Sequence, residues 1–154
     1  MRKIIFMLLV AATMSNVANA QKISADKVPA SVTSAFKAKF PTATKVSWEM
    51  EKTEYEANFK LNSEEVSANF DNIGKWMETE TEIKVSALPT AIQSSLKKDF
   101  EGYKINEASK IESVKNGNCY EAEVEKGEET FDVLYSADGK VLSKTKVEGK
   151  EKKD

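Results

Sequence analysis

The chain has 154 residues, with 23 basic and 25 acidic side chains, one cysteine and no histidine. The absence of histidine excludes Ser-His-Asp and Cys-His catalysis, His-containing zinc sites and His-ligated haem. With Cys119 as the only cysteine, no intrachain disulfide can form, so the stability of the fold must come from packing.

The first 20 residues have the three zones of a secretory signal peptide. Arg2 and Lys3 precede an apolar run of about nine residues, which is too short to cross a bilayer, and an Ala-Asn-Ala cleavage site ends at Ala20. We therefore expect residues 1–20 to be removed, leaving a periplasmic or secreted protein with no membrane insertion. The remaining chain has 21 basic and 25 acidic residues, a balance that argues against a nucleic-acid partner.

The next segment is predicted to form a helix of about three turns. Val32, Phe36 and Phe40 lie four residues apart, which places them on one face of a helix. Pro29 suits the first turn, where its missing N–H removes no hydrogen bond, and Pro41 ends the helix.

After this helix the apolar period changes from 3.6 to 2, which indicates strands. Tyr55, Ala57 and Phe59 alternate with polar residues, as is typical of an antiparallel sheet with one covered face. Turn residues such as those at 62–63 and 72–74 separate the alternating runs. Strands are expected near residues 45–50, 54–61, 65–70 and 75–83.

The same succession recurs in the second half of the chain. Val28, Val32, Phe36 and Phe40 recur 60 positions later as Leu88, Ile92, Leu96 and Phe100, whereas Tyr55-Glu56-Ala57 recurs 65 positions later as Tyr120-Glu121-Ala122. The five extra residues contain Asn116-Gly117 and indicate a longer hairpin. Strands are expected near residues 104–114, 119–126, 130–135 and 140–147. The sequence does not decide which side chains of the last strand in each half face the core. Met77 and Ile83 hold one parity of the alternation, whereas Val141 and Val147 hold the opposite parity once the 65-residue offset between the copies is applied.

The predicted fold is therefore α+β, with two tandem α-β-β-β-β units whose helices pack on one face of antiparallel sheet. The first unit is expected to span residues 21–85 and the second residues 86–148, followed by a polar tail at 149–154. Cys119 falls on the wet side of its predicted strand, either as an inert residue or as a thiol that reacts or links two chains.

Several segments together resemble the exported PepSY-like, β-lactamase-inhibitor-like family of Bacteroidetes. The matching segments are Val28-Pro29-Ala30 with Val32, Phe36 and Phe40-Pro41, then Ala43 to Glu49, Tyr55-Glu56-Ala57, and Phe70-Asp71 with Gly74-Lys75-Trp76. The resemblance covers nearly all of residues 28–148, and the second copy departs from it at Glu101, where the first has Pro41, and in having no tryptophan. It implies a helix-on-sheet unit in tandem, similar to the two-repeat β-lactamase inhibitor protein, and a periplasmic or secreted location. It implies no activity, because a shared fold does not fix function.

Two groups of residues are candidates for a partner-binding surface. Glu78, Glu80 and Glu82 project from one face of a strand and could take a cation or a basic partner, or they could simply keep a strand face solvated. Trp48 and Trp76 are binding candidates if they share that face, and core residues if they do not.

No catalytic or phosphate-binding motif is present, and no metal site or cofactor is predicted. Glutamate is so abundant that pairs of carboxyls carry no specific signal for an acid and a base of a catalytic site. The glycines are dispersed among turns, so no glycine-rich phosphate-binding loop is present. We therefore expect a non-enzymatic binding module that engages a protein or peptide of the cell envelope through its open sheet face, as an inhibitor or regulator of an envelope enzyme. The alternative is a small-ligand-binding protein that uses a groove between the two repeats.

Overall fold

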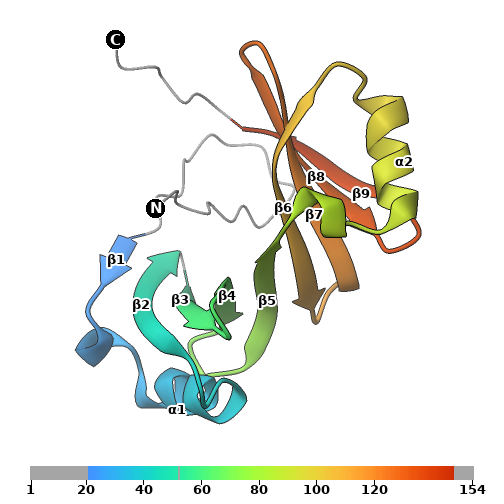
Figure 1. The fold of residues 1–154 in the computed structure, drawn as a ribbon. Helices are drawn as coiled ribbons and strands as arrows, with labels where there is room; N and C mark the ends of the chain where they lie inside the picture. Colours follow the sequence, from blue (N-terminus) through green and yellow to red (C-terminus); the bar gives the residue numbers. More distant parts are fainter. Residues whose placement is uncertain (1–20, 52, 148–154) are drawn as a thin grey trace.

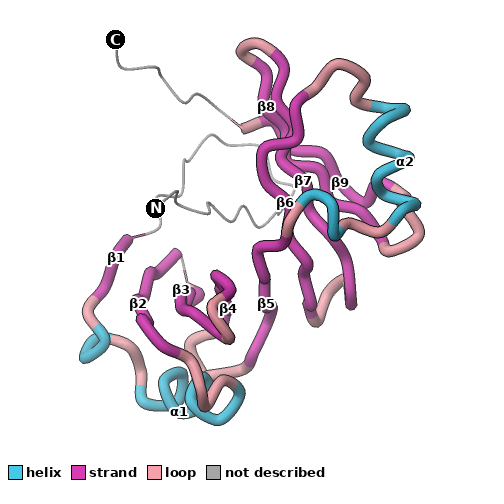
Figure 2. Tube along the Cα trace, in the orientation of Figure 1, coloured by secondary structure: helices cyan, strands magenta, loops and turns pink. Residues whose placement is uncertain are grey.

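The computed structural model describes residues 21–51 and 53–147, and it is built on a single antiparallel sheet (Figures 1 and 2). The predicted signal peptide and the polar tail lie outside the described residues. The first half contains β1 (Gln21–Ile23), α1 (Ala30–Lys39), β2 (Thr44–Glu51), β3 (Glu54–Leu61), β4 (Glu64–Phe70) and β5 (Trp76–Ile83). The second half contains α2 (Thr90–Asp99), β6 (Lys104–Ser113), β7 (Gly117–Lys126), β8 (Glu129–Ser136) and β9 (Val141–Lys146). Short 3-10 turns, η1 (Ala25–Lys27) and η2 (Val85–Ala87), precede the two helices.

Over the described residues the sheet has nine strands in the order of the chain, and each strand pairs antiparallel with its neighbour. The pairing of β5 with β6 joins the two halves, because its register runs from Glu78 opposite Ser113 to Ile83 opposite Ala108. The predicted α+β class, with helices covering antiparallel sheet, is confirmed.

Both helices cover the same side of this sheet. Residues directly opposite each other on paired strands point to the same face of the sheet. The register of each pair therefore shows which residues of successive strands share a face. Ile83, Ala108 and Ala122 form one such line across β5, β6 and β7, and all three pack in the core beneath α2. Ala68 faces Thr79 on β5, on that same side, and Ala68 packs beneath α1. We call this side the helix face and the other side the open face. Figure 1 shows α1 and α2 on the outer side of the curved sheet.

Each helix buries its apolar stripe in a separate core. Phe36 of α1 makes edge-on ring contacts with Trp48 at 5.2 Å and with Phe59 at 5.1 Å between ring centroids. In the second half, Ile92 and Leu96 of α2 are almost fully buried in the core that contains Ala122 and Tyr135. The predicted helical residues therefore form the centres of the two cores.

A glycine turn fixes the start of each helix against the sheet. Gly74 and Gly139 have φ of +89° and +86°, in the left-handed region where a side chain is strained. A Cβ atom on Gly74 would lie 2.6 Å from the carbonyl oxygen of Ser31, and one on Gly139 would lie 2.7 Å from that of Ala91. Only glycine permits so close an approach at both places.

The structure refines the predicted elements in three respects. The strand β1 and the two 3-10 turns carry no apolar period and were not predicted. The helices end one residue earlier than expected, and Pro29 and Pro89 occupy the N-cap position rather than the first helical turn. Each last strand has a bulge near its start, between Asn69 and Phe70 opposite β5 and between Leu134 and Tyr135 opposite β9, and because the two bulges are equivalent they do not account for the difference in apolar parity.

Candidate functional site

The open face of the central strands carries a concentration of carboxyl groups. Register places Glu80 between Ser67 and Ile111, and it places Ser109 between Glu82 and Glu121. We call Glu78, Glu80 and Glu121 the acidic cluster. Other carboxyls on this face include Glu54, Glu56, Glu82, Glu107, Glu123 and Asp132. The strand alternation thus gathers negative groups from β3, β5, β6, β7 and β8 on one side.

Glu80 is the most deeply buried member of the cluster, with 3% of its surface exposed. Its Oε1 accepts a hydrogen bond from the Ser109 hydroxyl, and its Oε2 has no hydrogen-bond partner among the described residues. Burial raises the pKa of the Glu80 carboxyl to about 7, with the Ser109 bond opposing the shift and Glu78 adding to it. A solvated strand face, one of the two predicted interpretations, therefore does not describe Glu80.

Glu78 and Glu121 are also strongly perturbed. Burial raises the pKa of Glu78 to about 7, and the charge of Glu121 is the next largest cause. Burial raises the pKa of Glu121 to about 8, followed by the charge of Glu80. Because like charges oppose one another in a poorly solvated place, the cluster holds protons at neutral pH that ordinary glutamates would release.

A hollow of about 300 Å³ opens beside the cluster. Glu78 and Glu121 line it together with Glu54 and Asp132, so four carboxyls surround one space. Its apolar wall consists of Met77, Ile111, Leu134 and Leu142. Among the described residues that line it, Lys115, in the turn between β6 and β7, is the one basic residue, and it is exposed to solvent. The hollow therefore combines an apolar wall with a strongly acidic one.

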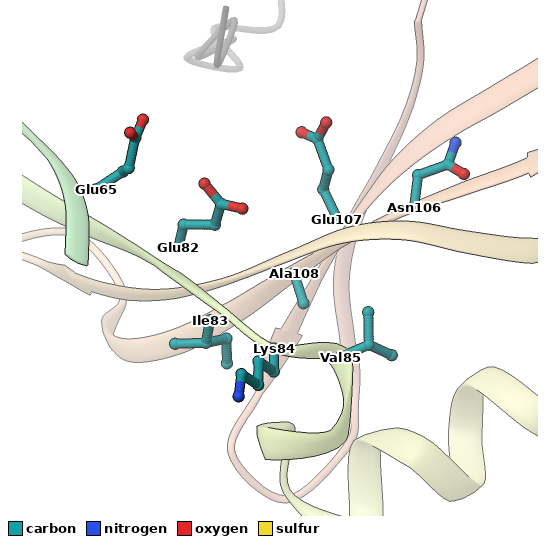
Figure 3. A pocket seen from close by; sticks show the side chains of 8 residues that line it. All are labelled: Glu65, Glu82, Ile83, Lys84, Val85, Asn106, Glu107 and Ala108. Atoms are coloured by element: carbon teal, nitrogen blue, oxygen red, sulfur yellow. The ribbon is translucent and has the colours of Figure 1, made fainter. Parts of the chain in front are cut away.

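A second hollow, of about 360 Å³, lies where the two halves join, and it is the groove that the small-ligand alternative requires. Figure 3 shows the carboxylates of Glu65, Glu82 and Glu107 on one side of the ribbon, with Ile83 and Ala108 on the other. The apolar residues thus do not share a wall with the charged ones. This arrangement lacks the mostly apolar lining of a small-molecule site.

The structure separates the two tryptophans from the glutamates. Trp48 is 6% exposed and packs edge-on against Phe36. Trp76 packs against the core beneath α1, donates a hydrogen bond from Nε1 to the Thr79 hydroxyl at 2.8 Å, and has Lys39 Nζ 3.9 Å from its ring centroid. Both residues lie on the helix face, so neither extends the acidic surface.

Cys119 lies on the open face, as predicted, but it is not exposed. Its side chain is fully buried opposite Ile111 and Ser136. Burial, followed by the charge of Glu78, raises the pKa of its thiol to about 11. A thiol in this state is a poor nucleophile, because the thiolate is the reacting form.

Two polar residues of this face were not predicted as site residues. Asn69 lies opposite Glu78, is 7% exposed, and its Oδ1 has no hydrogen-bond partner within the described part of the chain. Glu121 shares strand parity with Cys119, so its face could be predicted, but its proximity to β5 depends on the order of the strands. Among the described residues, no group of three or more acidic or cysteine side chains could hold a metal ion.

The comparisons with known proteins identify the family. A family model described as "Putative beta-lactamase-inhibitor-like, PepSY-like" matches residues 14–67 and again residues 53–143. The chain belongs to this PepSY-like family. All three residues of the acidic cluster lie inside the second match. No curated protein is significantly similar to this PepSY-like chain.

Solved structures share the fold of this PepSY-like protein. A "BLIP-like protein" from Bacteroides fragilis has a TM-score of 0.70 at 22% identity, over 82% of this chain and 91% of its own. A "putative periplasmic" protein from Bacteroides eggerthii has a TM-score of 0.72 at 21% identity, over 77% of this chain and 88% of its own. A DUF2874 family protein from Bacteroides uniformis gives the same four values.

The description of the Bacteroides eggerthii protein as periplasmic is consistent with the periplasmic or secreted location expected for this chain from its sequence. Within the described residues, the PepSY-like chain has no helix that is long and apolar enough to cross a membrane.

Proposed function

We propose that this PepSY-like protein is a non-enzymatic binding protein, periplasmic or secreted, which engages another protein or peptide of the cell envelope through the open face of its sheet. The observation that carries the proposal is the acidic cluster, with its buried carboxyls beside an open hollow. The helices stabilise the other face, so the open face is left for a partner.

The energetics of the cluster support a role in binding. Placing Glu78, Glu80 and Glu121 in poorly solvated positions destabilises the charged form of each, as their raised pKa values record. Such groups concentrate at functional sites, because stability alone would favour neutral or apolar residues there. A partner that supplies donors or positive charge offsets this cost.

The finer role proposed for the protein is inhibition or regulation of an envelope enzyme. The family description contains the words "beta-lactamase-inhibitor-like", and the relative from Bacteroides fragilis is described as BLIP-like. Both descriptions support an inhibitor as the working hypothesis for this chain. An enzymatic role has weaker support, because the open face presents carboxyls but no nucleophile of raised reactivity among the described residues.

The proposed architecture is a pair of α-β-β-β-β units, at residues 21–85 and 86–148. Two overlapping family matches support it, as does the equivalent placement of Gly74 against Ser31 and of Gly139 against Ala91. Because β5 and β6 are paired, both units contribute to one open face.

Site-directed photo-crosslinking in the native host tests the proposed surface. A photoreactive amino acid at Asn58 of β3 or Thr145 of β9 lies on the open face, whereas one at Lys37 or Lys97 lies on the exposed side of a helix. We expect the open-face positions to form a discrete crosslinked product and the helix positions to form none. Equal crosslinking from both faces, or none from the open face, would refute the proposal.

A further inference from the structure

We propose that the hollow beside the acidic cluster is a receptor for an arginine side chain of the partner. The inference rests on the proposed function, and it assigns the chemistry of the group that the open face recognises. The occupant must be long and apolar along its stem and positively charged at its end, because the hollow has walls of both kinds.

The apolar wall accounts for the stem. Ile111 is 1% exposed and forms the floor, while Leu142 is 44% exposed at the rim. The apolar wall thus extends from the buried floor to the exposed rim. A stem of methylene groups that enters from solvent can pack along this wall while its charged end lies at the carboxyls.

The acidic wall accounts for the charge. Four lining carboxyls, Glu54, Glu78, Glu121 and Asp132, face one lining lysine. Lys115 is exposed in the turn between β6 and β7, and its charge lowers the pKa of Glu78 less than burial and Glu121 raise it. Among the described residues, the lining therefore has more acidic than basic groups, which suits a cationic occupant.

The carboxyl lining favours arginine over lysine. Glu78 of β5 and Glu121 of β7 both line the hollow, and Oε1 of Glu78 has no hydrogen-bond partner among the described residues. Glu80 and Asn69, which also have an unpartnered acceptor, do not line the hollow. A guanidinium group has five N–H donors in a planar fork and is more weakly hydrated than an ammonium group, so it satisfies more than one lining carboxyl at a smaller desolvation cost.

Binding of a cation here is coupled to proton release. The titratable and charged groups that face the hollow and the cluster are Glu54 and Glu56 from β3, Glu78, Glu80 and Glu82 from β5, Lys115 from the β6–β7 turn, Cys119, Glu121 and Glu123 from β7, and Asp132 from β8. Because Glu78 and Glu121 hold protons near neutral pH, a cation must displace those protons. Affinity for arginine is therefore expected to rise between pH 6 and pH 8.

The test is a nuclear magnetic resonance titration of the purified protein with Nα-acetyl-arginine amide, and with Nα-acetyl-citrulline amide as the uncharged isostere. We expect saturable, low-millimolar shifts of the methyl signals of Ile111, Leu134 and Leu142 with the arginine probe only. The substitutions Glu78→Gln and Glu121→Gln should each weaken binding by about fivefold or more, because each removes a charged acceptor. Glu112→Gln is the matched control, because Glu112 is exposed and lies opposite Thr79 on the helix face.

A variant that is expected to bind more tightly shows that weaker binding of the other variants is not caused by misfolding. Lys115→Gln removes the competing cation from the lining and should tighten arginine binding by about twofold. Equal shifts with the citrulline probe, shifts that map outside the hollow, or equal affinities of the Glu121→Gln and Glu112→Gln variants would overturn the proposal. If the arginine probe fails while open-face crosslinks persist, only the assignment of arginine is overturned. Loss of the crosslinks overturns the open-face function itself.

Discussion

Glu80 carries a buried carboxyl in the middle of the open face, and its raised pKa makes a prediction at the scale of one residue. Below pH 4.5 the group is protonated in both the folded and the unfolded state, so it contributes no penalty. As the pH rises from 4.5 to about 7, the unfolded state loses its proton first, and the folded state is progressively destabilised. Stability should therefore fall with rising pH in this window.

The substitution Glu80→Gln removes that penalty while keeping the size of the side chain and an acceptor for Ser109. We expect the variant to be about 2 kcal/mol more stable than the natural protein at pH 8 and equally stable at pH 4. Urea unfolding at the two pH values measures the difference. Glu82→Gln is the control, because Glu82 is exposed on the same strand and should change stability little at either pH. A gain of the same size at pH 4 would show that burial of charge is not the cause.

At the scale of the elements, the two glycine turns determine how closely each hairpin approaches its helix. Gly74→Ala and Gly139→Ala impose both a strained φ and a clash with a backbone carbonyl oxygen. We expect each variant to lose at least about 2 kcal/mol of stability. Gly117→Ala shares the positive φ, +66°, but its Cβ would meet nothing within 4 Å. It should lose only about 1 to 2 kcal/mol, the cost of the left-handed conformation alone.

Thermal unfolding followed by circular dichroism ranks the three variants. If Gly117→Ala proved as damaging as Gly74→Ala, close packing of the turn against α1 would contribute nothing, and the conformational strain would explain both losses.

The elements themselves were largely predictable because their information is local. Apolar residues spaced four apart around Phe36 and Leu96 predict the helices, and alternation of apolar and polar residues around Tyr55 and Tyr120 predicts strands. The predicted strand bounds therefore lie within about two residues of those observed. The strand β1 escaped because Gln21–Ile23 is too short to show a period. The face of Glu80 was predictable, whereas its burial depends on the pairing of β5 with β6, which local periodicity does not encode.

At the scale of the whole molecule, one sheet joins two separate cores. Phe36 anchors the core beneath α1 and Leu96 the core beneath α2, yet β5 and β6 are paired over six residue positions from Glu78 to Ile83. Unfolding one half would expose the backbone groups of that shared ladder. The two halves are therefore expected to unfold together.

The positions of the tryptophans make this cooperativity measurable. Trp48 and Trp76 both belong to the first half, so their fluorescence reports on the core beneath α1 alone. Gly139→Ala damages the second half, and it should nevertheless lower the fluorescence midpoint by about 6 °C, since about 2 kcal/mol is lost from a shared transition. Circular dichroism should give the same midpoint. A fluorescence midpoint that stayed at the natural value, while circular dichroism showed an earlier loss of structure, would mean that the halves unfold independently. The open face would then be a junction of two autonomous surfaces, and an arginine bound to Glu121 of β7 would stabilise only the second half.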